Sequence, residues 1–312
     1  MSSTHARTVR LVSTGIMVAG LGWVAYLLGT TLDHPSRFIP DSSGWLTMAT
    51  FLLAASMTMS VFIFHAFLDM QDGPPFSRLL SARLFLTGQL LRYLPGRIWG
   101  VVYQIGITRE HFPATRIVRV NLDMMVFMLI GNSLVSLLLL GYRLNWSPAF
   151  LIFTALTGFV GLVFIFLGGA NWLVRLPINR VPDKISRLLL ALSSTRADPA
   201  KLAYIFFFFS LGWVFYVTAW SLLAKAYPVF AEVDFVALCA FYTLASLIGI
   251  LSAITPAGLG VREAAFIVLA SAVADLEVLA FFAVFGRIWL LVVELTLMLC
   301  FLACLLRRTD QK

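Results

Sequence analysis

The sequence predicts an all-α fold: a polytopic helical membrane protein with about eight membrane-crossing helices and a re-entrant broken helix. The chain of 312 residues is 60% hydrophobic and only 12% charged, whereas soluble domains carry about 25% charged residues. Apolar runs of roughly 20 residues recur from end to end, and each is long enough to cross the hydrocarbon core as a helix. These runs lack the alternation of polar and apolar residues that is typical of barrel strands.

Seven uninterrupted apolar runs predict full membrane spans. They are 9–31, 45–67, 117–141, 148–171, 202–225, 235–254 and 277–306. The first run follows two arginines and resembles a signal peptide, but it exceeds the roughly 7–15 apolar residues of a secretory signal and is interpreted as an uncleaved span. We therefore expect a single integral membrane domain over residues 1–312.

Two further apolar segments, 79–107 and 256–274, are interrupted by proline and glycine. The interrupting residues are Pro95, Gly96, Pro256, Gly258 and Gly260. Proline removes a helix hydrogen bond and glycine costs about 1 kcal/mol in a helix, so each interruption should end one half-helix and begin another. Interrupted segments in both halves of a membrane protein point to a transport site.

Basic residues predict the orientation, because Lys and Arg concentrate on the cytoplasmic side. The longest loop, 172–201, is rich in both and is expected in the cytoplasm, and segment 79–107 is expected to enter and leave by the cytoplasmic face. If 256–274 crosses, both termini are cytoplasmic, and the basic residues after 306 favour this orientation; if it is re-entrant, the C-terminus lies outside. The net charge of +8 then reflects contact with anionic lipid in the cytoplasmic (inner) membrane rather than binding of nucleic acid.

Charged residues inside apolar runs are candidate functional residues, because each is costly at membrane depth without a partner or a purpose. Arg287 and Glu294 lie near the middle of the last span, seven residues apart, and therefore share a face. They form an ion pair, directly or through another residue, or they line a hydrophilic cavity. Asn121 and Asp123 face the same cavity or lie at the membrane interface.

Arginines beside both interruptions suggest an anion site. Arg262 and Glu263 begin the half-helix after Gly260, where free amides and a partial positive charge favour an anion. The planar guanidinium donors match phosphate, whereas Glu263 could simply favour the helix dipole. Arg92 and Arg97 flank the first interruption and either contact phosphate or extend to the cytoplasmic surface.

Motifs for other chemistry are absent from the sequence. It has no phosphate-cradling nucleotide loop, no His-Glu-x-x-His and no Gly-x-Ser-x-Gly. Its three cysteines lie in apolar runs as packing residues, and no Cys/His pattern has zinc spacing. We expect no catalytic residue, no metal and no cofactor.

Two segments resemble the hallmark motifs of the lysylphosphatidylglycerol synthase transmembrane family, also called the flippase-like family. They are Arg92-Tyr93-Leu94-Pro95-Gly96-Arg97-Ile98-Trp99-Gly100 and Pro256-Ala257-Gly258-Leu259-Gly260-Val261-Arg262-Glu263-Ala264. The resemblance spans most of the chain and implies a membrane region that translocates an aminoacylated phospholipid. Free-standing members are linked to envelope lipids or polysaccharide assembly. The chain departs from the family at Ala257, where a second glycine is expected, and in lacking the synthase domain after Lys312, so the cargo is expected to differ.

The expected function is that of a lipid translocase that moves an anionic or phosphate-bearing headgroup across the bilayer. The expected headgroup-binding residues are Arg97, Arg262, Glu263, Arg287 and Glu294. Expected partners are a phospholipid or polyprenyl-phosphate-linked sugar, together with a glycosyltransferase or lipid synthase, but no nucleic acid. One alternative is a membrane-embedded lipid-modifying transferase with Glu263 or Glu294 as base. Another is a non-catalytic accessory subunit of a glycosyltransferase system.

Overall fold

The computed structural model describes residues 26, 39–71, 74–93, 98–110, 112–169, 198–230, 233–252 and 258–309. Four predicted site residues lie outside these ranges, as do nearly all of the first predicted span and most of loop 172–201. These four residues are Pro95, Gly96, Arg97 and Pro256. Within the described ranges all regular secondary structure is helical and no strand occurs, which confirms the all-α class. The count of about eight spans and the re-entrant helix remain predictions.

The helices follow the predicted apolar segments closely. The uninterrupted runs form α2 (Ser43–Asp69), α5 (Ala114–Arg143), α6 (Pro148–Phe164, continued by the π-helical turn Ile165–Gly169), α9 (Pro199–Ala226), α10 (Phe235–Ser252) and α12 (Leu276–Thr309). The interrupted segments form α3 (Arg78–Leu91), α4 (Trp99–Thr108) and α11 (Val261–Ala270), and a 3-10 turn, η3, covers Pro228–Phe230. Five helices of the described chain, α2, α5, α6, α9 and α12, are long and apolar enough to cross a membrane.

Polar side chains fix where several helices begin. Ser42, Ser77 and Ser147 each accept a backbone N–H from the first turn of α2, α3 and α6, and Asp198 does the same for α9. Such caps satisfy amides that have no partner inside the helix. Prolines at the first position of α6 and α9 fit the same pattern, because proline has no N–H to lose there.

The longest helix–helix contact is the antiparallel pair α2 and α9. The Asp41 N–H donates to the Ala226 carbonyl at one end, at 2.9 Å, and Lys201 Nζ donates to the Asp69 carbonyl at the other, at 2.5 Å. Halfway between them, Ser56 Oγ donates to the Gly212 carbonyl at 2.8 Å. These contacts define two ends and a middle level for the whole molecule.

The end that holds Arg78, Arg109, Arg116 and Lys201 is here called the basic end. Arg116 fastens it, because its guanidinium donates to the carbonyls of Leu68, Gln71 and Pro74 and stacks on Phe76 and Phe112. At the opposite end, Arg143, the last residue of α5, pairs with Asp234 before α10. Each end is therefore closed by contacts between segments far apart in the sequence.

Helices α3 and α4 form an antiparallel hairpin that begins and ends at the basic end. Gln104 Nε2 donates to the Leu84 carbonyl at 3.1 Å, and the backbones of Gly88 and Gly100 touch, so that a Cβ at Gly100 would lie 2.9 Å from the Gly88 oxygen. Small residues allow such close crossings inside membranes. With 14 and 10 residues, these helices are roughly 21 and 15 Å long, short of the hydrocarbon thickness.

Helices α10 and α11 form a second antiparallel hairpin, which begins at the opposite end with Asp234. Tyr242 packs edge-on against Phe266, with ring centroids 5.4 Å apart, and the backbones of Gly249 and Gly258 touch near the turn. Gly258 has φ +72° and Gly260 has φ +80°, a region that glycine enters without strain. The sequence prediction of an interruption at these glycines is consistent with this turn.

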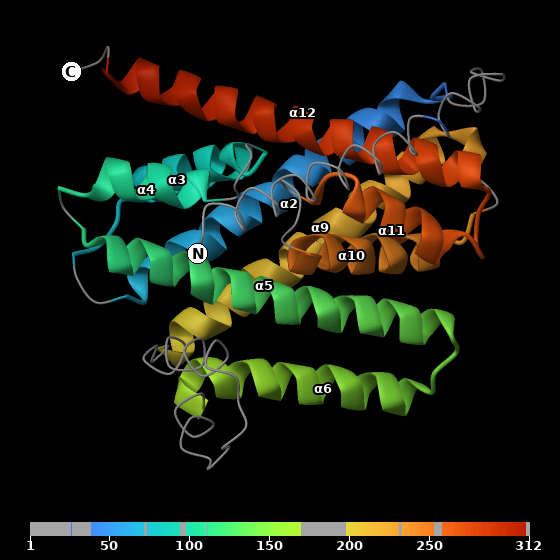
Figure 1. The fold of residues 1–312 in the computed structure, drawn as a ribbon, viewed down its shortest axis with the longest axis horizontal. Coiled ribbons are helices and arrows are strands. Elements are labelled where there is room, and N and C mark those ends of the chain that lie inside the picture. Colours follow the sequence, from blue (N-terminus) through green and yellow to red (C-terminus); the bar gives the residue numbers. More distant parts are fainter. Residues whose placement is uncertain are drawn as a thin grey trace, which may run out of the picture.

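Helix α12 passes both hairpins on its way to the basic end, as Figure 1 shows with α3 and α4 on the left and α10 and α11 on the right. Trp289 Nε1 donates to Thr50 Oγ1 at 2.9 Å, and Thr87 Oγ1 contacts Met298 Sδ at 3.8 Å. The two hairpins thus enter the molecule from opposite ends, and their turns meet beside the middle of α12.

Candidate functional site

An interior cavity of about 290 Å³ lies at the middle level of the molecule, where seven helices converge. Ser56 and Gly212, the hydrogen-bonded pair at the centres of α2 and α9, both line it. One part of its wall is polar and charged, and the rest is formed by aromatic rings, leucines and methionines. The polar and charged lining includes Gln89, Arg92, Asn132, Ser246, Arg262 and Glu294.

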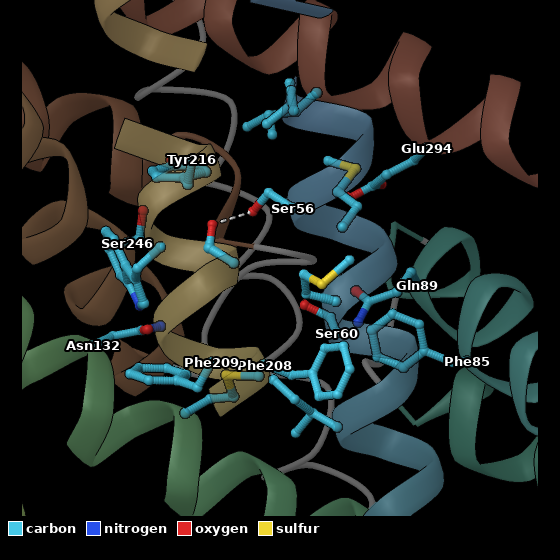
Figure 2. A pocket seen from close by; sticks show the side chains of 18 of the residues that line it. Ser56, Ser60, Phe85, Gln89, Asn132, Phe208, Phe209, Tyr216, Ser246 and Glu294 are labelled. Atoms are coloured by element: carbon cyan, nitrogen blue, oxygen red, sulfur yellow. Dashed lines mark hydrogen bonds between the residues drawn. The ribbon is translucent and has the colours of Figure 1, made fainter. Parts of the chain in front are cut away.

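Figure 2 shows how several of these side chains are arranged around the cavity. Glu294 of α12 and Gln89 of α3 lie on one side, and Tyr216 and Ser246 lie on the other. Phe208 and Phe209 line the cavity toward the α5 side, next to Asn132. The cavity is therefore amphipathic, with a charged region and an aromatic region.

Arg92, the residue after α3, reaches across to α12. Its Nη2 donates to Glu294 Oε1 at 2.5 Å and its Nη1 donates to Gln89 Oε1 at 2.6 Å. The carboxylate is only 9% exposed, whereas the arginine side chain is 42% exposed. Arg92 thus neutralises a buried carboxylate but keeps one side open to the cavity.

Glu263 supports the second hairpin and does not line the cavity. One of its oxygens accepts the Gly260 N–H at 2.8 Å, which caps the start of α11, and the other faces Arg287 Nη1 of α12 at 3.6 Å. Both side chains of the Arg287 pair are nearly buried. The Glu263 carboxylate therefore accepts the amide at the start of α11, where the sequence predicted an anionic ligand. It also links α11 to α12 through Arg287.

Arg262 differs from the other two arginines. Its guanidinium lines the cavity and stacks over the Tyr242 ring at 4.3 Å, but no carboxylate of the described chain lies within ion-pair distance of it. Its Nε is buried without a hydrogen-bond acceptor there. A half-buried cation without a counter-ion is costly in a low-dielectric interior, so this position favours an anionic ligand.

Tyr93 joins the two interrupted segments. Its ring lies 5.2 Å from the Arg92 guanidinium and 5.3 Å from that of Arg287, and each contact is of the cation–π type. Tyr93 belongs to the first interruption and Arg287 is paired to the second, so this ring connects the turns of both hairpins through α12.

The local charge balance favours an anion. Among the described residues of this cluster, Arg92, Arg262 and Arg287 contribute three positive charges, whereas Glu263 and Glu294 contribute two negative charges. One positive charge of this described set remains, and Arg262, which pairs with no carboxylate of the set, faces the cavity. The geometry thus offers one or two guanidinium groups to a negative group at the middle level.

The structure brings most of the predicted site residues together. Tyr93, Gly258, Gly260, Arg262, Glu263, Arg287 and Glu294 lie in one cluster, with Arg92. Arg287 and Glu294 do not pair with each other, because each binds a partner from a different hairpin. Asn121 instead donates to Gln104 Oε1 at 2.6 Å, and Asp123 accepts from Gln71 at 3.0 Å. Neither of these two lines the cavity, and both join α5 to neighbouring segments.

Sequence reasoning missed the uncharged polar lining. Gln89 precedes Arg92 by three residues and therefore shares its helical face. Asn132 lies well inside the long apolar helix α5, at a depth where an amide side chain is expensive without a role. These two signals, an amide beside a cation and an amide within an apolar run, could have identified both residues.

No group of histidine, cysteine and carboxylate side chains in the described ranges could hold a metal ion. Comparison of the chain with protein-family models, with curated proteins and with solved structures found no match.

Proposed function

We propose that this protein is a lipid translocase that binds a phosphate-bearing headgroup in the interior cavity and moves it between the leaflets of the bilayer. The observation that carries the proposal is Arg262, a cation that faces the cavity without a carboxylate partner among the described residues. Its guanidinium suits phosphate because its donors form a fork that matches two phosphate oxygens.

The depth of the cavity supports transport. It lies at the centres of the crossing helices α2 and α9, and binding sites near the midplane, formed by interrupted helices, are typical of transporters. Two hairpins that enter from opposite ends would bring one turn to the midplane from each leaflet. In this proposal each hairpin is re-entrant. Helix α10, predicted as the full span 235–254, and α11 together enter and leave by the end opposite the basic end, and a headgroup passes between the turns of the two hairpins.

The amphipathic wall supports a lipid as the cargo. The charged region around Arg262 and Glu294 would hold the headgroup, and the aromatic region around Phe208 and Phe209 would contact the start of an acyl chain. When phosphate arrives, Arg92 would stay paired with Glu294 and would turn its exposed side toward the phosphate, beside Arg262.

In this proposal the basic end faces the cytoplasm, because basic residues concentrate on that side of the inner membrane. Helix α12 runs to the basic end, which places the C-terminus in the cytoplasm, and a crossing at 9–31 would place the N-terminus there as well. The resemblance of the two interruptions to the lysylphosphatidylglycerol synthase transmembrane family supports the same function. Partners would be a phospholipid or a polyprenyl-phosphate-linked sugar and the enzymes that make or use it.

Leaflet exchange in proteoliposomes tests the proposal against both alternatives. Fluorescent phospholipid would be placed in vesicles, and its exposure to a membrane-impermeant quencher would be followed with and without the purified protein. Exchange without chemical change of the lipid supports translocation. A chemically modified lipid would instead identify a transferase with Glu294 as base. If the protein neither exchanges nor modifies the lipid, the accessory-subunit alternative is favoured.

A matched pair of variants makes this test specific. Arg262→Ala removes the cation that lines the cavity, whereas Arg109→Ala removes an exposed cation at the basic end. Both proteins should remain monodisperse in detergent. The proposal expects slower lipid exchange with Arg262→Ala and the wild-type rate with Arg109→Ala. Equal rates in the two variants would contradict it.

A further inference from the structure

A second cavity, of about 270 Å³, lies beside the first between α2, α3 and α12. Three residues of α3, spaced four apart, form one wall: Arg78, Ala82 and Leu86. This spacing places them on one helical face, and eight residues correspond to about 12 Å along the helix. The cavity therefore extends from the basic end toward the middle of the molecule.

The walls of this second cavity are apolar. Thr58 Oγ1 already donates to the Ala54 carbonyl at 2.8 Å, and His65 contacts Ser81 Oγ at 2.9 Å and Asp69 at 3.4 Å. The other lining residues apart from Arg78 are aliphatic or aromatic. A cavity without unsatisfied polar groups stays dry and accepts hydrocarbon.

Arg78 gives this cavity a charged mouth. It is exposed at the first position of α3, and no carboxylate of the described residues pairs with it. Basic pockets between transmembrane helices bind the headgroups of anionic lipids. An apolar cavity with one exposed cation at its edge is complementary to a single amphiphile, with a negative head and a hydrocarbon tail.

The second cavity also shares a wall with the first. Leu86 and Leu297 line both, and they lie one helical turn from Gln89 and Glu294 respectively. A chain that fills the second cavity would press on these two leucines and so on the turn that carries Arg92. Occupancy of the second cavity would therefore support the wall of the interior site.

We infer that the second cavity is a separate binding site for an anionic phospholipid, with its phosphate at Arg78 and one acyl chain between α2, α3 and α12. The chain ends against Leu86 and Leu297. This site is distinct from the interior cavity and does not require that the interior cavity carries lipid.

Photo-crosslinking tests this inference. The full-length protein would be reconstituted in phosphatidylcholine vesicles with a small fraction of phosphatidylglycerol that carries a diazirine in one acyl chain. Adducts would be located by peptide mass spectrometry, and phosphatidylcholine with the same photoreactive chain would serve as the headgroup control. The expected adducts lie on Val61, Ala82, Leu86 and Phe301, with phosphatidylglycerol exceeding phosphatidylcholine by about fivefold.

Four variants sharpen the test. Ala82→Trp fills the cavity and should abolish these adducts. Arg78→Glu, a change of an exposed residue, should lower them by at least about fivefold. Arg109→Glu, an equal charge change outside the cavity, should leave them unchanged. Arg262→Ala should also leave them unchanged, which separates this site from the interior one. Equal labelling by both headgroups, or wild-type labelling in folded Arg78→Glu protein, would overturn the inference.

Discussion

The two hairpins have the same construction, but they differ in whether the arginine that each brings to the cavity is paired with a carboxylate. Each is antiparallel, and each closes on a glycine pair, Gly88 with Gly100 and Gly249 with Gly258. The α3–α4 hairpin brings its cation, Arg92, to a carboxylate of α12. The α10–α11 hairpin brings Arg262 to the same cavity, where no carboxylate of the described residues pairs with it.

This difference shows how two neighbouring residues of one hairpin can have separate roles, one in stabilising the fold and one in binding a ligand. The second hairpin does contain a carboxylate, Glu263, but that group caps α11 and faces Arg287, so it does not neutralise its own neighbour. Arg262 therefore keeps its charge available for a ligand. The proposed function assigns ligand binding first to Arg262 and only second to Arg92, whose charge is shared with Glu294.

The largest expected effect is the loss of transport in Arg262→Ala. A charge-assisted hydrogen bond is worth roughly 1.5–3 kcal/mol, so lipid affinity should weaken by about ten- to a hundredfold. Arg262→Lys should lose much of the activity as well, because ammonium lacks the two-pronged donor geometry. Arg92→Ala, combined with Glu294→Gln so that no buried carboxylate is left unpaired, should weaken binding less. Affinities measured with detergent-solubilised protein would check this order, and a stronger effect of the Arg92 double variant would reverse the comparison.

The next largest effect concerns stability at the Arg287 pair. Arg287→Met leaves Glu263 as a buried carboxylate opposite an apolar side chain, which should cost about 3–5 kcal/mol. The double change Arg287→Met with Glu263→Gln should recover part of this loss, because no unpaired charge remains. Thermal unfolding in detergent measures both. Full recovery of transport in the double variant would show that the pair serves folding alone, whereas no recovery of stability would contradict the pairing.

Gly258→Ala probes the tighter hairpin turn. An alanine there must adopt φ +72° and would place its Cβ 3.0 Å from the Gly249 backbone, at a cost of about 1–3 kcal/mol. Gly106→Ala on α4 is the matched control, because its Cβ would meet nothing within 4 Å. That control should be neutral or stabilising by up to about 1 kcal/mol. Equal unfolding temperatures for the two variants would argue against the close approach at Gly258.

The smallest effect is expected at the far end of the molecule. Arg143 and Asp234 form an ion pair that is partly exposed, and such pairs contribute about 0–1 kcal/mol. Arg143→Ala should therefore change the unfolding temperature slightly and leave leaflet exchange unchanged. A large loss of exchange in this variant would show that coupling between α5 and α10 takes part in transport.

The helices could be predicted from the sequence because their signals are local. Apolar length defined six long segments within a few residues, and proline with glycine indicated where the two hairpins turn. The partners of the charged residues could not be predicted in the same way. The seven-residue spacing of Arg287 and Glu294 placed them on one face, but it could not indicate that each binds a different hairpin. Those contacts depend on which glycines allow close packing, and that is a property of the tertiary structure.

Glu263 shows the same limit at a single residue. Its position three residues after Gly260 favours a capping role, and the sequence left that role open beside headgroup binding. The structure engages both of its oxygens, one with the Gly260 amide and one facing Arg287. Asn121 gives a second example, because its partner Gln104 lies on another helix.

The most direct test of the central claim, that Arg262 holds a lipid phosphate in the interior cavity, is mass spectrometry of the lipids that copurify in mild detergent. Wild-type protein and Arg262→Ala would be purified side by side, with Arg109→Ala as the control. The account predicts one class of phosphate-bearing lipid enriched with the wild type and with Arg109→Ala, and depleted about tenfold or more with Arg262→Ala. The same lipids in equal amounts on all three proteins would contradict it.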